Sequence, residues 1–233
     1  MTENELYRYV VDKAATFGMK SKNERDRTSN VTNDRGNAVI RHNTGDNPYF
    51  ALIGKDEETS GKYNGLSFVI FPNKVDDGVV RHCVMSICIG SATLGNDTAM
   101  ACNPGFRRSF MKLVNGKDCQ FFFAENWGDM ESRTPGLKEA VEETNDETLS
   151  NTVSSYDDNP AGGREGLMPA ACLLTFAEGF DPADGIPVID AWLAQYAQWR
   201  LWDTNRQSRE NADAAINNVR VASKSNADLG RIY

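Results

Sequence analysis

Two apolar stretches near the middle of the chain, residues 66–71 and 82–89, are rich in β-branched and aromatic side chains. The sequence between them, Pro-Asn-Lys-Val-Asp-Asp-Gly at 72–78, consists largely of turn-forming residues, and this combination is typical of a β-hairpin. Neither stretch alternates regularly between apolar and polar positions, so both faces of the hairpin should be covered. The pattern therefore predicts a hairpin inside a sheet that has packing layers on both sides.

Shorter apolar runs predict further strands at 38–41, 49–53 and 119–124. The apolar run at 167–176 leaves its type open. Its Ala-Ala-Cys-Leu-Leu sequence favours a helix, whereas Pro169 is tolerated in a helix only near the start.

Helical spacing of apolar residues predicts helices near both ends of the chain and in its middle. Thr2 and Glu5 form a capping-box pattern at the start of the first helix. Asn103, as N-cap, and Pro104, at the first helical position, begin the central helix. The predicted helices cover residues 3–18, 104–114, 137–144, 187–202 and 211–221.

Together these elements predict an α+β fold, in which a mixed or antiparallel sheet of about five strands is packed by N-terminal, central and C-terminal helices. We expect residues 1–128 to form the sheet-plus-helix core. Residues 129–166 should be an acidic flexible insertion, and residues 167–233 a helical C-terminal part that packs on the core.

The negative charge is concentrated in one segment. The chain carries a formal net charge of −8, and nine acidic residues between positions 129 and 158 are opposed there only by Arg133 and Lys138. Residues 145–165 are also poor in apolar residues, which predicts a disordered or lid-like excursion. The remainder of the chain is nearly neutral and is therefore compatible with a local cationic surface.

Several kinds of chemistry lack their usual sequence signals. The only histidines are His42 and His82, and no group of potential ligands has the spacing of a metal site. No catalytic motif is recognisable, so we expect neither an enzyme nor a cofactor. No apolar run approaches the roughly 18 residues of a membrane span, and the N-terminus lacks a signal-peptide pattern, so we expect a cytoplasmic protein without a membrane partner. Five cysteines without a Cys-x-x-Cys pair are expected to be reduced and buried, namely Cys83, Cys88, Cys102, Cys119 and Cys172.

A candidate anion-binding surface lies around the predicted central helix. Arg107 and Arg108 lie close to its N-terminus, where free N–H groups and adjacent guanidinium groups favour phosphate, although pairing with the chain's own carboxylates is the alternative. The candidate phosphate-contacting residues are Arg35, Arg41, Arg107, Arg108 and Lys112. The candidate residues for a base pocket are Tyr49, Tyr63 and Trp127, each of which could instead serve in packing.

Three segments in series resemble the N-terminal domain of McrB-like proteins, the targeting subunits of modification-dependent restriction systems. They read NPYFALI (47–53), YNGLSFVIF (63–71) and VMSICIG (84–90), and the resemblance covers about residues 37–114. Tyr49 stands where that family commonly has Trp. The resemblance implies a DNA-binding domain that can recognise a modified base, and that works with a GTP-driven AAA+ motor or a nuclease subunit.

Two hypotheses of function follow. The first is a DNA-recognition module of a prokaryotic defence or restriction system. The second is a protein-interaction adapter that uses the acidic insertion and an exposed tryptophan of the C-terminal helix, from among Trp192, Trp199 and Trp202. A hydrolase or nuclease would need a carboxylate cluster that the sequence does not display.

Overall fold

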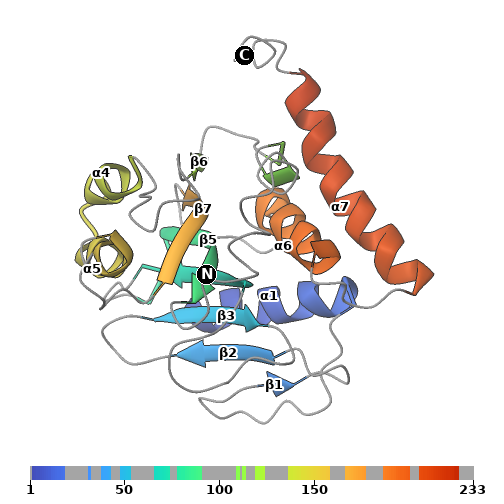
Figure 1. Cartoon of the computed structure of the whole chain (residues 1–233), viewed down its shortest axis with the longest axis horizontal. Coiled ribbons are helices and arrows are strands. Elements are labelled where there is room, and N and C mark those ends of the chain that lie inside the picture. Colours follow the sequence, from blue (N-terminus) through green and yellow to red (C-terminus); the bar gives the residue numbers. More distant parts are fainter. Residues whose placement is uncertain are drawn as a thin grey trace.

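The fold is taken from a computed structural model, drawn in Figure 1. It describes residues 2–18, 31–32, 38–42, 48–53, 66–73, 78–90, 109–110, 112–113, 119–123, 136–157, 166–176, 186–199 and 205–225. The strands are β1 (Val31–Thr32), β2 (Ala38–His42), β3 (Tyr49–Ile53), β4 (Leu66–Pro72), β5 (His82–Gly90), β6 (Cys119–Phe123) and β7 (Gly166–Thr175). The helices of the described ranges are α1 (Glu3–Thr16), α4 (Leu137–Glu142), α5 (Glu147–Asp157), α6 (Pro187–Trp199) and α7 (Arg206–Ser225).

All described strands join one sheet in the order β1-β2-β3-β4-β5-β7-β6, and each neighbouring pair is antiparallel. This arrangement confirms the predicted α+β class. The sheet has seven strands instead of the expected five or so, because β1 is very short and residues 166–175 add a strand.

The sheet separates two hydrophobic clusters. Successive side chains along a strand point to opposite faces, so Phe50 and Leu52 enter one cluster while Ala51 enters the other. Helices α1, α6 and α7 cover the first face, and α4 and α5 cover the second (Figure 1). We call these the α6 face and the α5 face.

The central hairpin is formed by β4 and β5, which pair along their whole length. Residues 67–72 of β4 and 83–88 of β5 are buried, which confirms a hairpin with cover on both faces. Asn73 closes the adjoining turn, because its Oδ1 accepts the backbone N–H groups of Arg81 at 2.9 Å and His82 at 3.1 Å. These two bonds link the end of β4 to the start of β5.

The apolar run at 167–176, for which the sequence allowed either a helix or a strand, forms strand β7 between β5 and β6. The helical alternative for 167–176 is therefore wrong. Cys172 enters the α6-face cluster, whereas Ala171 and Leu173 enter the α5-face cluster. Because both faces are covered, the strand reads as a continuous apolar run without a period of two.

Pro169 lies inside this strand, where a proline cannot donate a ladder hydrogen bond. The register between β5 and β7 shifts between Ile87 and Ile89, so Cys88 faces two residues, Met168 and Pro169. Such a β-bulge leaves one residue unpaired. The bulge thus explains how a central strand accommodates the proline.

The described part of the acidic segment, residues 136–157, forms two short helices on the α5 face. Helix α4 confirms the helix predicted at 137–144, but α5 lies where we expected a disordered or lid-like excursion, and that expectation is wrong for α5. Leu149 and Val153, one turn apart, are buried in the α5-face cluster. Asp146 Oδ1 accepts the Leu149 N–H at 2.8 Å and caps the helix.

Helix α1 begins with the predicted capping box. The Glu5 N–H donates to Thr2 Oγ1 at 3.3 Å, and the Thr2 N–H donates to Glu5 Oε2 at 2.7 Å. Helix α7 begins earlier than the predicted residue 211, because Asn205 Oδ1 accepts the Ser208 N–H at 2.9 Å and caps it.

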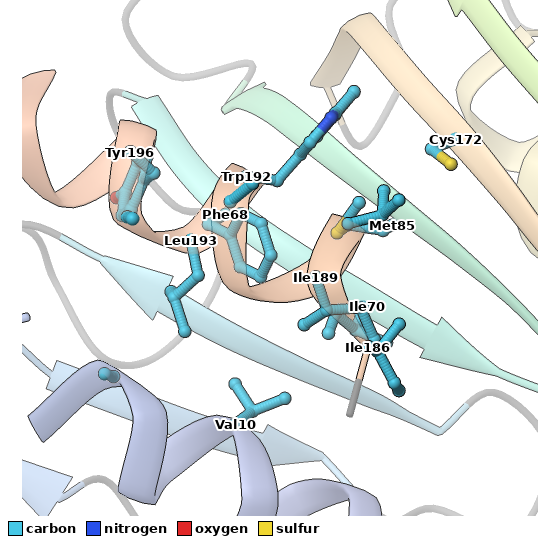
Figure 2. Close-up of a cluster of buried hydrophobic side chains, with 14 of the residues drawn as sticks. Val10, Phe68, Ile70, Met85, Cys172, Ile186, Ile189, Trp192, Leu193 and Tyr196 are labelled. Carbon is cyan, nitrogen blue, oxygen red and sulfur yellow. The ribbon is translucent and has the colours of Figure 1, made fainter. Parts of the chain in front are cut away.

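Helix α6 lies at the centre of the α6-face core, as Figure 2 shows. The predicted apolar stripe is confirmed, since Ile189, Trp192 and Leu193 are fully buried. Tyr196 is also fully buried, and its hydroxyl donates to the Leu52 carbonyl at 2.9 Å. This bond ties α6 to β3.

Most of the central helix predicted at 104–114 lies outside the described residues. Ser109 and Phe110 are helical, and Lys112 and Leu113 form a turn. We call these four residues the 109–113 segment. Among the described helices, none combines the length and the apolar character that a membrane crossing requires.

Candidate nucleic-acid interface

Only part of the candidate surface can be placed. Arg35, Arg107, Arg108, Tyr63 and Trp127 lie outside the described residues. The backbone of Arg41 lies in β2, opposite Phe50 of β3. Lys112 and Tyr49 are the candidates whose burial is described.

The 109–113 segment is anchored on α6. Phe110 is fully buried, and its ring meets that of Trp192 edge-on, with centroids 5.0 Å apart and an interplanar angle of 66°. The indole Nε1 of Trp199 donates to Ser109 Oγ at 3.3 Å. Leu113 is fully buried as well. Apolar side chains on either side of Lys112 thus hold its backbone to the core, while Lys112 itself is exposed.

Tyr49 lies on the other face of the sheet. It is half-buried and packs against the α5-face cluster, with its ring centroid 6.3 Å from that of Phe71. The 109–113 segment belongs to the α6 face instead. The structure therefore does not bring Tyr49 and Lys112 together, and the contacts of Tyr49 are those of a packing residue.

The described part of the acidic segment is separated from Lys112 by the sheet. The exposed acidic residues of this layer are Glu139, Glu142, Glu143 and Glu147. They belong to α4, α5 and the turn between them, on the α5 face. The sheet therefore lies between these carboxylates and the segment that carries Lys112.

A polar network that sequence reasoning missed joins α1 to α6. The Tyr9 hydroxyl donates to Asp190 Oδ1 at 2.6 Å, and Lys13 Nζ lies 2.9 Å from Asp190 Oδ2. The Ile186 N–H donates to the Tyr9 hydroxyl at 3.3 Å. Burial and the neighbouring Asp190 carboxylate raise the pKa of Tyr9 well above its ordinary value. We call Tyr9, Lys13 and Asp190 the α1–α6 network. Tyr9 and Asp190 are 181 positions apart, and no sequence pattern indicates that they are in contact.

His82 and the thiols are held in structural contacts. His82 Nδ1 lies 3.1 Å from Thr175 Oγ1, and partial burial lowers the pKa of His82. Cys83 enters the α6-face cluster, so the imidazole and the neighbouring thiol diverge as expected for adjacent strand residues. Burial raises the pKa of Cys83 to about 12 and that of Cys172 well above its ordinary value.

The described cysteines Cys83, Cys88, Cys119 and Cys172 are thiols, and all but Cys119 are buried. Within the described ranges, no group of three or more His, Cys, Asp or Glu side chains is placed to hold a metal ion.

No protein-family model, curated protein or solved structure matches this chain. The resemblance to McrB-like N-terminal domains therefore rests on the three sequence segments alone. In the fold, these segments contribute to β3, β4 and β5, which are consecutive antiparallel neighbours.

Proposed function

We propose that the chain is a DNA-recognition module of a prokaryotic defence or restriction system, acting with an AAA+ motor or a nuclease subunit. The observation that carries the proposal is the position of Lys112. The acidic α4–α5 layer lies on one face of the sheet, and the segment carrying exposed Lys112 is anchored on the other. A negatively charged chain can thus offer phosphate a cationic contact away from that acidic layer.

The proposed contacts combine the described segment with its sequence neighbours. Lys112 is exposed at the surface, and Arg107 and Arg108 directly precede Ser109 in the sequence. A cationic side chain on an anchored backbone, as Lys112 is, is suited to positioning a phosphate backbone. Base recognition is assigned to Tyr63 and Trp127, and Tyr49 is assigned to packing.

The proposal places the chain in the cytoplasm, where such a system meets DNA. The largely buried thiols of the described core fit a reducing compartment.

Binding of short DNA duplexes, with and without modified bases, tests the proposal by fluorescence anisotropy across a range of salt. We expect affinity to fall steeply with salt, and the Arg107→Ala/Arg108→Ala and Lys112→Ala variants to bind more weakly. Each lost phosphate contact should reduce the slope of log K against log salt by about 0.9. The matched control is Arg206→Ala/Arg209→Ala, which removes the same charge from exposed positions of α7 and should leave binding unchanged. Salt-independent affinity, or unchanged affinity in the Arg107/Arg108 variant, would refute the proposal.

The adapter hypothesis gains no support from the described tryptophans. Trp192 is fully buried, and Trp199 is half-buried with its N–H directed to Ser109. Trp202 lies outside the described residues.

A further inference from the structure

Helix α6 contacts the 109–113 segment at two points of different chemistry. Near its middle, Trp192 supplies a buried aromatic contact to Phe110. Seven residues later, or about two helical turns, Trp199 supplies the polar contact to Ser109. Among the described residues, the indole N–H of Trp192 meets no hydrogen-bond acceptor, so of these two indoles it is Trp199 that donates to the segment.

We infer that Trp199 is a positioning residue for nucleic-acid binding: its N–H holds Ser109 and thereby fixes the backbone of the segment that presents the exposed Lys112. The inference rests on the proposed function and adds to it a determinant that itself makes no phosphate contact. A backbone already held in place loses less conformational freedom on binding than one that must be ordered by the ligand. Affinity should therefore depend on the Trp199–Ser109 bond.

The hydrogen bond between Trp199 and Ser109 lies at the edge of the core, so its loss can be distinguished from a loss of core packing. Ser109 and Trp199 are both partly exposed, so water can replace the lost partner when the bond is removed. The hydrophobic anchors of the segment, Phe110 and Leu113, remain in place. Loss of the bond should loosen the segment locally while leaving the core folded.

The test uses Trp199→Phe, Ser109→Ala and the double variant in the full chain, with a short unmodified DNA duplex as the probe. A single bond of this kind corresponds to about two- to ten-fold in the dissociation constant. We expect each single variant to weaken binding by that amount, and the double variant to bind no more weakly than the singles. The salt slope should stay at the wild-type value, because the number of phosphate contacts does not change.

Tyr196→Phe is the matched control, because it removes a hydrogen bond from the same helix on the side that faces β3. It should lower the melting temperature without changing the dissociation constant. Equal weakening of binding by Tyr196→Phe and Trp199→Phe would overturn the inference, since a general loss of stability would then explain both. Unchanged binding by Trp199→Phe would overturn it as well.

Hydrogen exchange without DNA separates this inference from the proposed function. Trp199→Phe should accelerate exchange of the backbone amides of residues 109–113, while amides of β4 and β5 keep their protection. Unchanged exchange in the segment refutes the positioning role whatever the DNA result. Accelerated exchange in a chain that shows no salt-dependent DNA binding supports the local anchoring and refutes the proposed function.

Discussion

Replacing Asp190 with Ala in the α1–α6 network should lower the free energy of unfolding by roughly 2–5 kcal/mol. The hydrogen bond from Tyr9 to this carboxylate is 2.6 Å long, and hydrogen bonds to charged groups contribute about 1.5–3 kcal/mol. The Lys13 contact adds less, about 0.2–1 kcal/mol, because the Lys13 side chain is 37 % exposed. The position of Asp190 in the first turn of α6 adds about 0.3–1 kcal/mol through the helix dipole.

Urea unfolding of a double-mutant cycle measures the energy of the hydrogen bond between Tyr9 and Asp190. Tyr9→Phe, Asp190→Ala and the double variant should show a coupling energy of about 1.5–3 kcal/mol, because each single change removes the same bond. Asp213→Ala is the control: it removes an exposed carboxylate that accepts from Gln198 at 2.9 Å, and it should lower stability by less than about 1 kcal/mol. A coupling energy within about 0.5 kcal/mol of zero, the usual range for independent sites, would show that the network does not join α1 to α6 energetically.

Three further predictions concern the core and its titratable groups. Burial lowers the pKa of His82, so the unfolded chain takes up a proton at higher pH than the folded chain, and the free energy of unfolding should fall as pH drops below about 6.5. Between pH 8 and pH 5, urea titrations should show a smaller loss of unfolding free energy for His82→Gln than for the wild type. Equal losses would contradict this prediction. Leu149→Ala should lower the unfolding free energy by about 2–5 kcal/mol and speed hydrogen exchange throughout α5, because Leu149 is buried. If α5 were a loose lid, the same substitution would lower the unfolding free energy by less than about 1 kcal/mol. Since burial raises the pKa of Cys83 to about 12 and also that of Cys172, both thiols should resist alkylation at pH 8 until the chain unfolds, as read by mass spectrometry; labelling of either in the native state would contradict this.

Local signals in the sequence were sufficient for much of the fold. The hairpin at β4 and β5 could be predicted because its turn residues and its two apolar runs are adjacent in sequence. The capping box of α1 could be predicted for the same reason, since Thr2 and Glu5 lie within one turn. The apolar stripe of α6 is similarly local, because residues three or four apart share one helical face.

The errors fell where tertiary contacts decide the structure. Strand β7 has a helix-favouring composition, and it becomes a strand because β5 and β6 supply hydrogen-bonding partners on both sides. Helix α5 carries few apolar residues, yet Leu149 and Val153 meet a complementary cluster on the α5 face. Neither partner surface is visible from within the segment itself. Intrinsic propensity is therefore a weak guide in both places.

The candidate site was less predictable than the fold, because it required knowledge of which face each strand residue points to. Tyr49 and Phe50 are neighbours in sequence, but they enter clusters on opposite sides of the sheet. A shift of one residue would have exchanged their faces. Grouping Tyr49 with Lys112 from sequence alone ignored that choice, and the register of β3 against β4 decides it.

The same alternation explains how net charge and local charge can differ in one small fold. A covered sheet presents two separate helical surfaces, and each is free to carry its own charge because the core between them holds few ions. Here the surplus carboxylates of α4 and α5 belong to one surface, and the segment with exposed Lys112 belongs to the other. A polyanion approaching the α6 face has the sheet and its buried clusters between itself and the acidic α4–α5 layer. The net charge of −8 is a property of the whole chain and does not give the charge of either face.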